Sequence, residues 1–239
     1  MTHPKETAVP NHHADHAPFS GATGLLVGLT MVWGRGAVAG LVADLADITE
    51  QDHVVDVGCG PGAFVREAQR RGARVTGIDP APVMLKLARA LTRQSPLVCW
   101  TEGAAEALPL PDESATVLWS VATIHHWTDV EHGLQEAHRV LQPRGRLLAV
   151  ERRVRRGATG HASHGWTIDQ AETFAHLCEA SGFETVHTET HVVGRRPMVV
   201  VLATRSPAPS GAEDVAGAAS DLDVLTRLDH EDLRVAREP

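Results

Sequence analysis

The sequence predicts an α/β domain whose parallel sheet is covered by helices on both faces. From His53 onward, short apolar runs typical of strands alternate with longer segments at helical spacing, which is the pattern of doubly wound sheets. The length of 239 residues suits one such domain with appendages. The expected strands are His53–Val57, Arg74–Ile78, Leu97–Trp100, Thr116–Ser120 and Arg146–Val150. The expected helices between them are Ala63–Arg71, Pro82–Arg93 and Val130–Leu141.

The following part of the chain predicts one more helix and a closing hairpin. Apolar residues recur at helical spacing over Thr167–Ser181, and Thr185–Val193 and Met198–Ala203 have the composition of strands. The short link Gly194–Pro197 between these strands fits an antiparallel hairpin. Ahead of the first strand, Gly24–Asp47 predicts one or two helices that would cap a ligand cleft.

Both ends of the chain differ in composition from the region between them. Residues 1–20 form a histidine-rich polar leader that we expect to be flexible, and its His12, His13 and His16 are expected to take up metal only incidentally. The folded domain is expected over residues 21–205. Residues 206–239 begin as a linker of serine, proline and alanine and continue as an acidic segment, which we expect to be a solvated tail.

Composition narrows the class of protein. A formal net charge of -8 and a pI of about 6.0 argue against a nucleic-acid partner. The sequence has no apolar run of the roughly eighteen residues that a membrane helix needs, and its beginning lacks the basic-then-apolar order of a signal peptide. The cysteines, Cys59, Cys99 and Cys178, are scattered and odd in number. We therefore expect a cytoplasmic protein.

A glycine-rich turn follows the first expected strand. Gly58, Gly60 and Gly62 allow a tight turn and leave room for a ligand to approach the backbone. Such loops hold nucleoside-containing cofactors. Asp56, at the end of the strand, would lie against the ligand and favour a cationic group over a pyrophosphate. S-adenosylmethionine carries such a cation.

The loop alone also fits a second cofactor class. The spacing Gly58-x-Gly60-x-x-Ala63 satisfies the dinucleotide fingerprint. Asp79 ends the second expected strand, where either cofactor would present its ribose hydroxyls, so it supports the fold and leaves the cofactor open. A nicotinamide-dependent oxidoreductase is therefore a rival, and Asp56 argues against it.

Five motifs in order along the chain resemble those of class I S-adenosylmethionine-dependent methyltransferases, especially the group that includes the ubiquinone and menaquinone biosynthesis enzymes. The resemblance runs from about Gly21 to Thr204. It implies a Rossmann-like, seven-stranded sheet in the order 3-2-1-4-5-7-6 with strand seven antiparallel. The motifs are Val54–Gly62, Val75–Asp79, Gly103–Asp112, Ser120–Trp127 and Arg139–Leu147.

The resemblance also assigns roles in binding the cofactor. Asp56 and the backbone of the glycine loop would face its methionine portion, Asp79 the ribose, and Pro80 and Met84 the adenine edge. Backbone groups after the third and fourth strands would complete the site. The cofactor-binding residues expected in this way are Asp56, Gly58, Cys59, Gly60, Gly62, Asp79, Pro80, Met84, Ala104, Ala105, Ser120 and Val121.

Two positions depart from the family pattern. Ala104 stands where an aspartate usually accepts a hydrogen bond from the adenine amine, and losing that bond would weaken binding by about 0.5–1.5 kcal/mol. Arg144 stands where a glycine is common, and we expect this to be a surface change without consequence.

The sequence predicts methyl transfer to a small-molecule acceptor through oxygen, carbon or nitrogen. This chemistry needs the acceptor, methyl group and sulfur in line, and it needs a base only when the acceptor must lose a proton. His125 is the candidate base, and His126 is a weaker candidate, since packing beneath the cofactor explains both. His161 and His164 are alternatives on the loop after the fifth strand.

That loop also carries charge. Arg152, Arg153, Arg155 and Arg156 would attract an anionic acceptor, although such a run is often only a solvated face. No resident metal is expected. The alternative function is a non-catalytic protein that binds S-adenosylmethionine or its product as a regulator or assembly partner, and Ala104 and the acidic tail keep it open.

Overall fold

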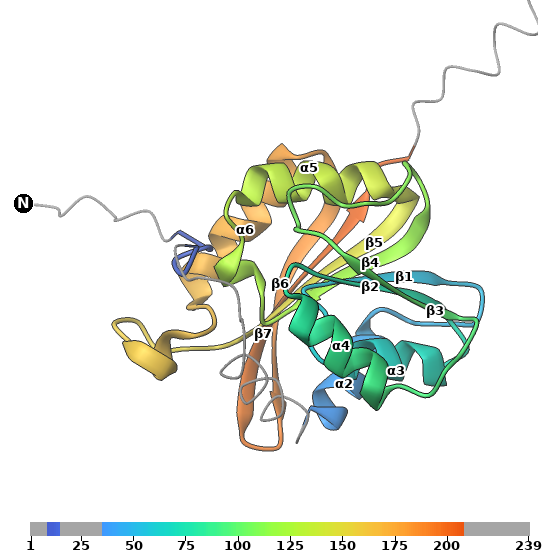
Figure 1. Ribbon diagram of the computed structural model, residues 1–239. Helices are drawn as coiled ribbons and strands as arrows, with labels where there is room; N and C mark the ends of the chain where they lie inside the picture. The colour runs from blue at the N-terminus through green and yellow to red at the C-terminus, as the bar shows by residue number, and fades with distance from the viewer. Residues whose placement is uncertain (1–8, 15–34, 208–239) are drawn as a thin grey trace, which may run out of the picture. The chain divides into compact units, whose positions relative to one another are not determined.

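A computed structural model describes residues 9–14 and 35–207 of the chain, with the exception of the His161 side chain. A seven-stranded sheet in the order β3-β2-β1-β4-β5-β7-β6 forms the centre (Figure 1). Strands β1 to β5 are parallel, and β7 runs antiparallel to both β5 and β6. This confirms the fold class and the sheet order that the sequence predicts. The strands are β1 His53–Val57, β2 Arg74–Asp79, β3 Val98–Glu102, β4 Ala115–Val121, β5 Leu141–Arg152, β6 Phe183–Val193 and β7 Arg196–Arg205.

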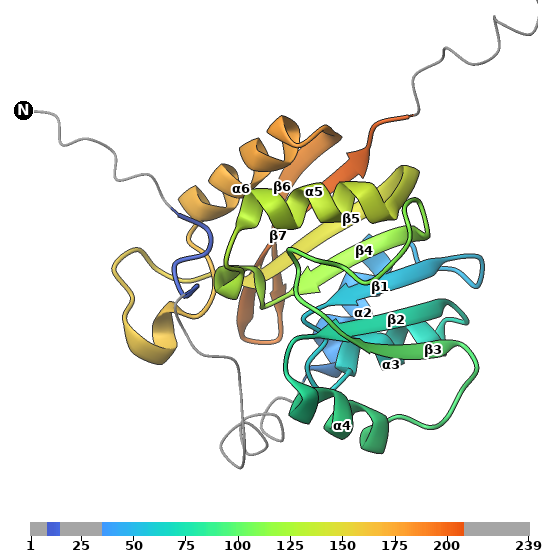
Figure 2. The ribbon, with the colours of Figure 1, turned by 45° about the horizontal axis from the view of Figure 1, so that its top comes forward.

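Helices cover both faces of the sheet. Two apolar cores result, one beneath α5 and α6 and one beneath α2, α3 and α4. Figures 1 and 2 show the two sets of helices on opposite faces. The described helices are α2 Gly36–Leu45, α3 Ala63–Arg70, α4 Pro82–Leu91, α5 Val130–Val140 and α6 Ile168–Ala180, with 3₁₀ turns at Ile124–His126 and Gly160–Ser163.

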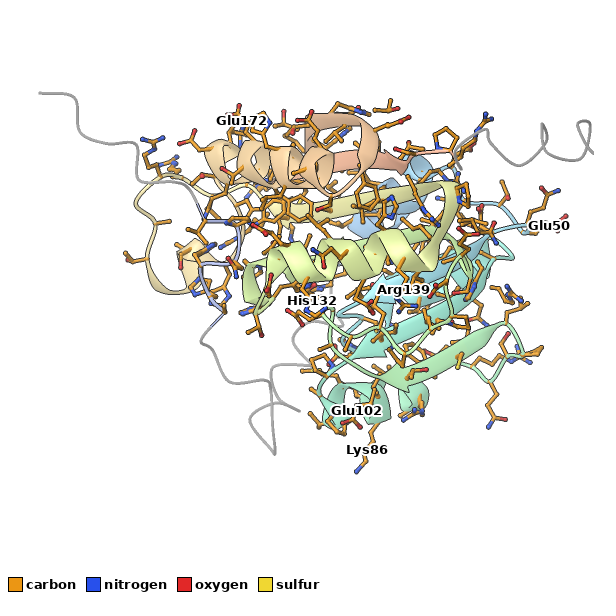
Figure 3. All side chains as sticks on the ribbon, turned by 90° about the horizontal axis from the view of Figure 1, so that it is seen from above. Glu50, Lys86, Glu102, His132, Arg139 and Glu172 are labelled. Carbon is orange, nitrogen blue, oxygen red and sulfur yellow. The ribbon has the colours of Figure 1, made fainter. Side chains whose placement is uncertain are left out.

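Capping side chains fix where the helices around the later strands begin. The Asp129 side chain accepts the His132 backbone N–H at 3.0 Å, and Thr167 and Gln170 form a reciprocal capping box. Arg139 of α5 ties its helix to the loop after β3, because its guanidinium donates to the carbonyls of Leu108 and Leu110 (Figure 3). These contacts fix the starts of α5 and α6 and the loop after β3.

The largest difference from the expected strand bounds is at β5. This strand begins at Leu141, directly after α5, and its pairing with β4 shifts in register between Ala115 and Val117. Within that irregular stretch Arg144 has φ 65°, a left-handed conformation that favours glycine. The residue expected to be an inconsequential surface change therefore carries a backbone cost that its sequence position did not reveal.

Part of the expected leader packs against the domain. The Asn11 side chain donates to the Trp127 carbonyl at 3.0 Å, and the Trp166 indole donates to the Pro10 carbonyl at 2.8 Å. The backbone N–H of His13 donates to the His125 carbonyl at 2.9 Å. Figure 2 shows this short segment beside α6 and the loop that precedes it. Residues 9–14 are thus docked, where the composition suggested a flexible segment.

Other expectations fall on parts of the chain outside the described residues. The helical segment expected over Gly24–Asp47 is represented by α2, while residues 24–34 lie outside, as do His16 and the tail from residue 208 onward. No helix in the described part of the chain is both long and apolar enough to cross a membrane.

Candidate active site

A cleft of about 830 Å³ opens at the carboxyl edge of the sheet. This is the edge at which open α/β sheets bind ligands. Its lining comes from α2, the glycine loop, the ends of β2, β4 and β5, and the β6–β7 hairpin. The lining residues are Arg35, Val38, Gly58, Gly60, Phe64, Asp79, Met84, Val121, Ala122, Thr123, His125, His126, Arg152, Arg153, His164, Arg195, Arg196, Pro197 and Met198.

Backbone hydrogen bonds fix the glycine loop to the neighbouring strand. The N–H groups of Gly58 and Cys59 both donate to the Ile78 carbonyl, at 2.8 and 2.9 Å. Asp79 accepts the Gly60 N–H at 2.8 Å and, through its other oxygen, the Ala81 N–H at 2.9 Å. Asp79 therefore holds the loop in place while it also lines the cleft.

The three glycines of the loop have left-handed backbones. Gly58, Gly60 and Gly62 have φ of 74°, 52° and 78°, values that side-chain-bearing residues rarely adopt. A Cβ at Gly58 would lie 2.6 Å from the Thr123 side chain, and one at Gly62 would overlap the Trp100 indole. At Gly60 a Cβ would meet no atom within 4 Å, so this glycine leaves open space beside the cleft.

Asp56 is a buried carboxylate with an unsatisfied oxygen. It is 1% exposed, and its Oδ2 has no hydrogen-bond partner among the residues that the structure describes. Burial, followed by repulsion from Asp79, raises its pKa to about 8, while Trp119 and the charge of Arg35 oppose that rise. The Trp119 indole nitrogen is itself buried, and the described part of the chain offers it no acceptor at hydrogen-bonding geometry. A cationic ligand placed beside Asp56 would stabilise the ionised carboxylate.

Comparisons with known proteins agree with this geometry. Residues 55–149 match the family model described as a methyltransferase domain. A demethylmenaquinone methyltransferase of Tropheryma whipplei is 36% identical over 121 residues, which cover 50% of this chain and 47% of that protein. A malonyl-[acyl-carrier protein] O-methyltransferase of Erwinia billingiae is 35% identical over 107 residues, covering 45% and 41%. The chain spans about half the length of these curated relatives.

Residues 55–149 match a methyltransferase domain, and the sheet order is that of the class I S-adenosylmethionine-dependent fold. S-adenosylmethionine is the cofactor of that family. A solved structure of an S-adenosylmethionine-dependent methyltransferase from Aquifex aeolicus has the same fold, with a TM-score of 0.64 at 18% identity over 75% of this chain and 97% of that one. The residues present in the cleft fit the cofactor, because an open glycine loop adjoins a buried, unsatisfied carboxylate.

The residues expected to bind the cofactor divide into two sets in the methyltransferase domain. One set lines the cleft, and the other lies behind it or beside it. Those on the cleft are Gly58, Gly60, Asp79, Met84 and Val121. Those outside the lining are Asp56, Cys59, Gly62, Pro80, Ala104, Ala105 and Ser120.

Residues of the second set support the cleft from behind. Cys59 is buried, and burial raises the pKa of its thiol well above the ordinary value, which fits a filler of the loop. Ser120 is buried, and its hydroxyl lies 2.5 Å from that of Thr123. The Ala104 carbonyl accepts the Ala107 N–H at 3.2 Å, which closes a tight turn in the segment expected to border adenine.

The histidine expected to act as a base is buried and held by a carboxylate. His125 is 3% exposed, and its Nδ1 lies 2.9 Å from Oε1 of Glu151. Glu151 is fully buried and also accepts the Ile124 N–H at 3.1 Å. Burial, and then the charge of His125, lowers the pKa of His126 to about 4. His126 is therefore neutral at physiological pH.

Three parts of the chain bring arginines to the cleft. Arg35 precedes α2, Arg152 ends β5 and Arg153 follows it, and Arg195 and Arg196 lie at the β6–β7 turn. Only part of the arginine run expected from the sequence lines the cleft. Arg155 and Arg156 are exposed and lie outside the lining. Arg156 forms an ion pair with Asp169.

The sequence reasoning missed several residues of the cleft. Arg35 and Val38 come from α2, Phe64 from α3, and Arg195 and Arg196 from the hairpin that closes the sheet. The expected capping role of the N-terminal helices pointed to α2, but no motif marked the hairpin. Ala122, directly after β4, has φ 57°, an unusual backbone conformation at the cleft that the sequence pattern also did not reveal.

Proposed function

We propose that this protein transfers the methyl group of S-adenosylmethionine to a small-molecule acceptor that carries a negative charge. The cofactor supplies an electrophilic methyl group on a sulfonium. The tasks of the chain are to bind the two reactants, to align them and to exclude water. The observation that carries the proposal is Asp56, whose buried and unsatisfied oxygen adjoins the glycine loop.

The charges around the cleft support an anionic acceptor. Of the acidic groups near it, Asp79 lines the cleft, while Asp56 and Glu151 are buried outside its lining. Arg153, Arg195 and Arg196 also line the cleft and are exposed to solvent. A cationic cofactor and an anionic acceptor would thus be drawn to different parts of one cleft, because each is attracted to opposite charge and the apolar walls strengthen the field.

An anionic attacking group removes the need for a base. A carboxylate or phenolate already carries the lone pair that displaces the sulfonium, so no proton has to leave during transfer. The role of His125 as general base stays a prediction. For acceptors that attack as anions, we assign the chain only binding and alignment, with the arginines of the cleft lining oriented toward the acceptor.

The cysteines of the protein indicate its cellular compartment. Its three cysteines are free, and two of them, Cys59 and Cys178, are buried. Free buried thiols suit a reducing compartment, so we infer a cytoplasmic enzyme of small-molecule metabolism. The negative net charge of the chain supports the inference that nucleic acid is not its substrate.

The test combines cofactor binding with an acceptor panel. Calorimetric titration with S-adenosylmethionine, S-adenosylhomocysteine and NADH should show binding of the first two alone. Turnover should then be measured on carboxylates and phenolates beside uncharged acceptors that can still be methylated, such as alcohols and anilines, with the release of S-adenosylhomocysteine as the readout. We expect turnover with anionic members of the panel. Cofactor binding without any methyl transfer across both sets would favour the non-catalytic alternative.

Paired arginine variants test the acceptor class. Replacing Arg153 and Arg195 together by methionine should raise KM for an anionic acceptor about tenfold, since two partly exposed charges are each worth about 0.2–1 kcal/mol. The value of kcat should change little. Arg155→Met is the matched control, because Arg155 lies on the same loop outside the cleft. An unchanged KM in the double variant would refute the proposed role of these arginines.

A further inference from the structure

Three histidines meet in the lining of the cleft. His125, His126 and His164 each offer a ring nitrogen, and these three atoms lie within 4.8 Å of one another. His125 and His126 belong to the 3₁₀ turn after β4, and His164 follows the 3₁₀ turn Gly160–Ser163. Two loops far apart in the sequence therefore bring three imidazoles together.

A buried carboxylate orients the innermost histidine. Nδ1 of His125 lies 2.9 Å from Oε1 of Glu151, and in the neutral imidazole this contact favours the tautomer with the proton on Nδ1 and the lone pair on Nε2. In many metal sites a carboxylate accepts a hydrogen bond from the ring nitrogen of the ligating histidine that does not bind the metal, which sets the tautomer and raises the basicity of the ligand. The other oxygen of Glu151 is buried and has no hydrogen-bond partner within residues 9–14 and 35–207. The charge of Glu151 would therefore be offset further by a cation on His125.

We propose that His125, His126 and His164 form a binding site for a divalent transition metal ion, with Glu151 as the residue that positions His125. Three neutral imidazoles suit zinc, and they also suit cobalt and nickel. A site with three protein ligands keeps a further coordination position for water or an anionic oxygen. Because the histidines line the cleft, a ligand in that position would lie inside it.

The spacing of the nitrogens is close to that of a formed site. Zinc–nitrogen bonds of about 2.1 Å in tetrahedral geometry place the nitrogens about 3.4 Å apart. The three ring nitrogens here lie within 4.8 Å of one another, and side-chain rotation of His126 and His164 would bring them to the shorter distance. Both of these residues are only partly buried, whereas His125 is held in place by Glu151.

Histidines of the docked segment lie close by but make other contacts. The His13 ring stacks on that of His164 with centroids 4.5 Å apart, and its Nε2 lies 3.1 Å from Oγ of Ser163. The Nε2 of His12 lies 3.0 Å from the Ser163 carbonyl. These contacts connect residues 9–14 to the loop that carries His164, and they make the docked segment a wall of the metal site.

Metal binding by the full chain tests this inference without cofactor or acceptor. Protein without an affinity tag, stripped with chelator, is titrated with Zn²⁺ in a calorimeter and with Co²⁺ under visible absorption. We expect one ion per chain and intense ligand-field bands of a low-coordinate cobalt site. Each of the variants His126→Asn and His164→Asn should weaken binding at least about 100-fold, and Glu151→Gln should weaken it about 10–100-fold.

Two controls separate this site from other histidines. His132→Asn, on the exposed surface of α5 (Figure 3), should leave the affinity unchanged. A leader variant with His3 and His16 replaced by alanine should still bind one ion. Thermal melts of every variant establish folding, and His164→Asn, which lies on a surface loop, decides the matter if His126→Asn is unfolded.

The proposal fails on any of three results. These are absence of micromolar binding to the folded wild-type chain, unchanged affinity in His164→Asn, and loss of the site in the leader variant. Because each readout is metal binding alone, none of these results bears on whether the protein transfers methyl groups.

Discussion

We expect the affinity for S-adenosylmethionine to fall with decreasing pH below about 8, because the Asp56 carboxyl must lose its proton when the cationic cofactor binds beside it. In the unliganded protein the pKa of Asp56 is about 8, raised first by burial and then by Asp79. Of the other groups around it, Arg35 opposes the rise, and the Cys59 thiol stays neutral because its own pKa is raised.

The magnitude follows from the cost of deprotonation. Each pH unit below the pKa costs 1.36 kcal/mol, which is tenfold in affinity. Between pH 7.5 and pH 5.5 the dissociation constant should therefore rise by up to about 100-fold. The rise stops where the pH reaches the pKa of Asp56 in the complex, which the cation lowers.

The raised pKa of Asp56 also makes the stability of the unliganded protein depend on pH, in the direction opposite to that of cofactor affinity. A carboxyl whose folded pKa exceeds its unfolded value of 3.8 holds a proton that the unfolded chain releases. The unliganded protein should therefore lose stability as the pH rises from about 4 to about 8. The variant Asp56→Asn removes this dependence, so it should be more stable than the wild type at pH 7.5 while binding the cofactor more weakly.

Calorimetric titration at pH 5.5, 6.5 and 7.5 measures the effect, and two buffers of different ionisation enthalpy reveal the released proton. The Asp56→Asn variant is the control for titration of the cofactor itself, and its dissociation constant should change little over the range. The two proteins should approach each other in affinity at pH 5.5. A wild-type affinity that is flat with pH, or a slope shared by both proteins, would refute the reasoning.

Four further substitutions test the backbone of the domain. Gly60→Ala should weaken cofactor binding at least about tenfold in a titration, because it places a methyl group beside the cleft. It should also destabilise the fold by about 1–2 kcal/mol in urea unfolding, because the backbone at this position has a φ of 52°. Gly40→Ala, inside α2 with open space around it, is its opposite and should stabilise by about 0.5–1 kcal/mol. Gly62→Ala should destabilise by more than about 2 kcal/mol, because it adds a clash with Trp100 to the backbone strain, and a loss no larger than that of Gly60→Ala would contradict the packing argument. Arg144→Gly should raise the free energy of unfolding by up to about 1 kcal/mol by relieving φ 65°, and a lower melting temperature would count against it.

The sequence predicted the elements whose information is local. The bounds of β1 were predicted to the residue, because an apolar run followed by a glycine turn specifies both the strand and its end. The positive φ of the loop glycines is likewise a property of their own positions. The sheet order came from the ordered motifs of the family, and the antiparallel hairpin from its short link.

The composition of the cleft depended on contacts between distant residues. Arg152 pairs with Met198 in the β5–β7 register, and the Arg153 N–H donates to the Pro197 carbonyl at 2.9 Å. This register sets the arginines of the two strands in the lining of one cleft, and a shift by one residue would turn each side chain to the other face of the sheet. No local pattern encodes such a register.

The histidine cluster has the same origin. The spacing of His125 and His126 is visible in the sequence, but His164 joins them only because the loop after β5 folds back and Trp166 is anchored to the docked segment through Pro10. Local periodicity and turn chemistry thus determined the strands, the helices and the cofactor loop. Long-range pairing and packing decided which arginine and histidine side chains line the cleft, because these residues come together only through contacts between segments far apart along the chain.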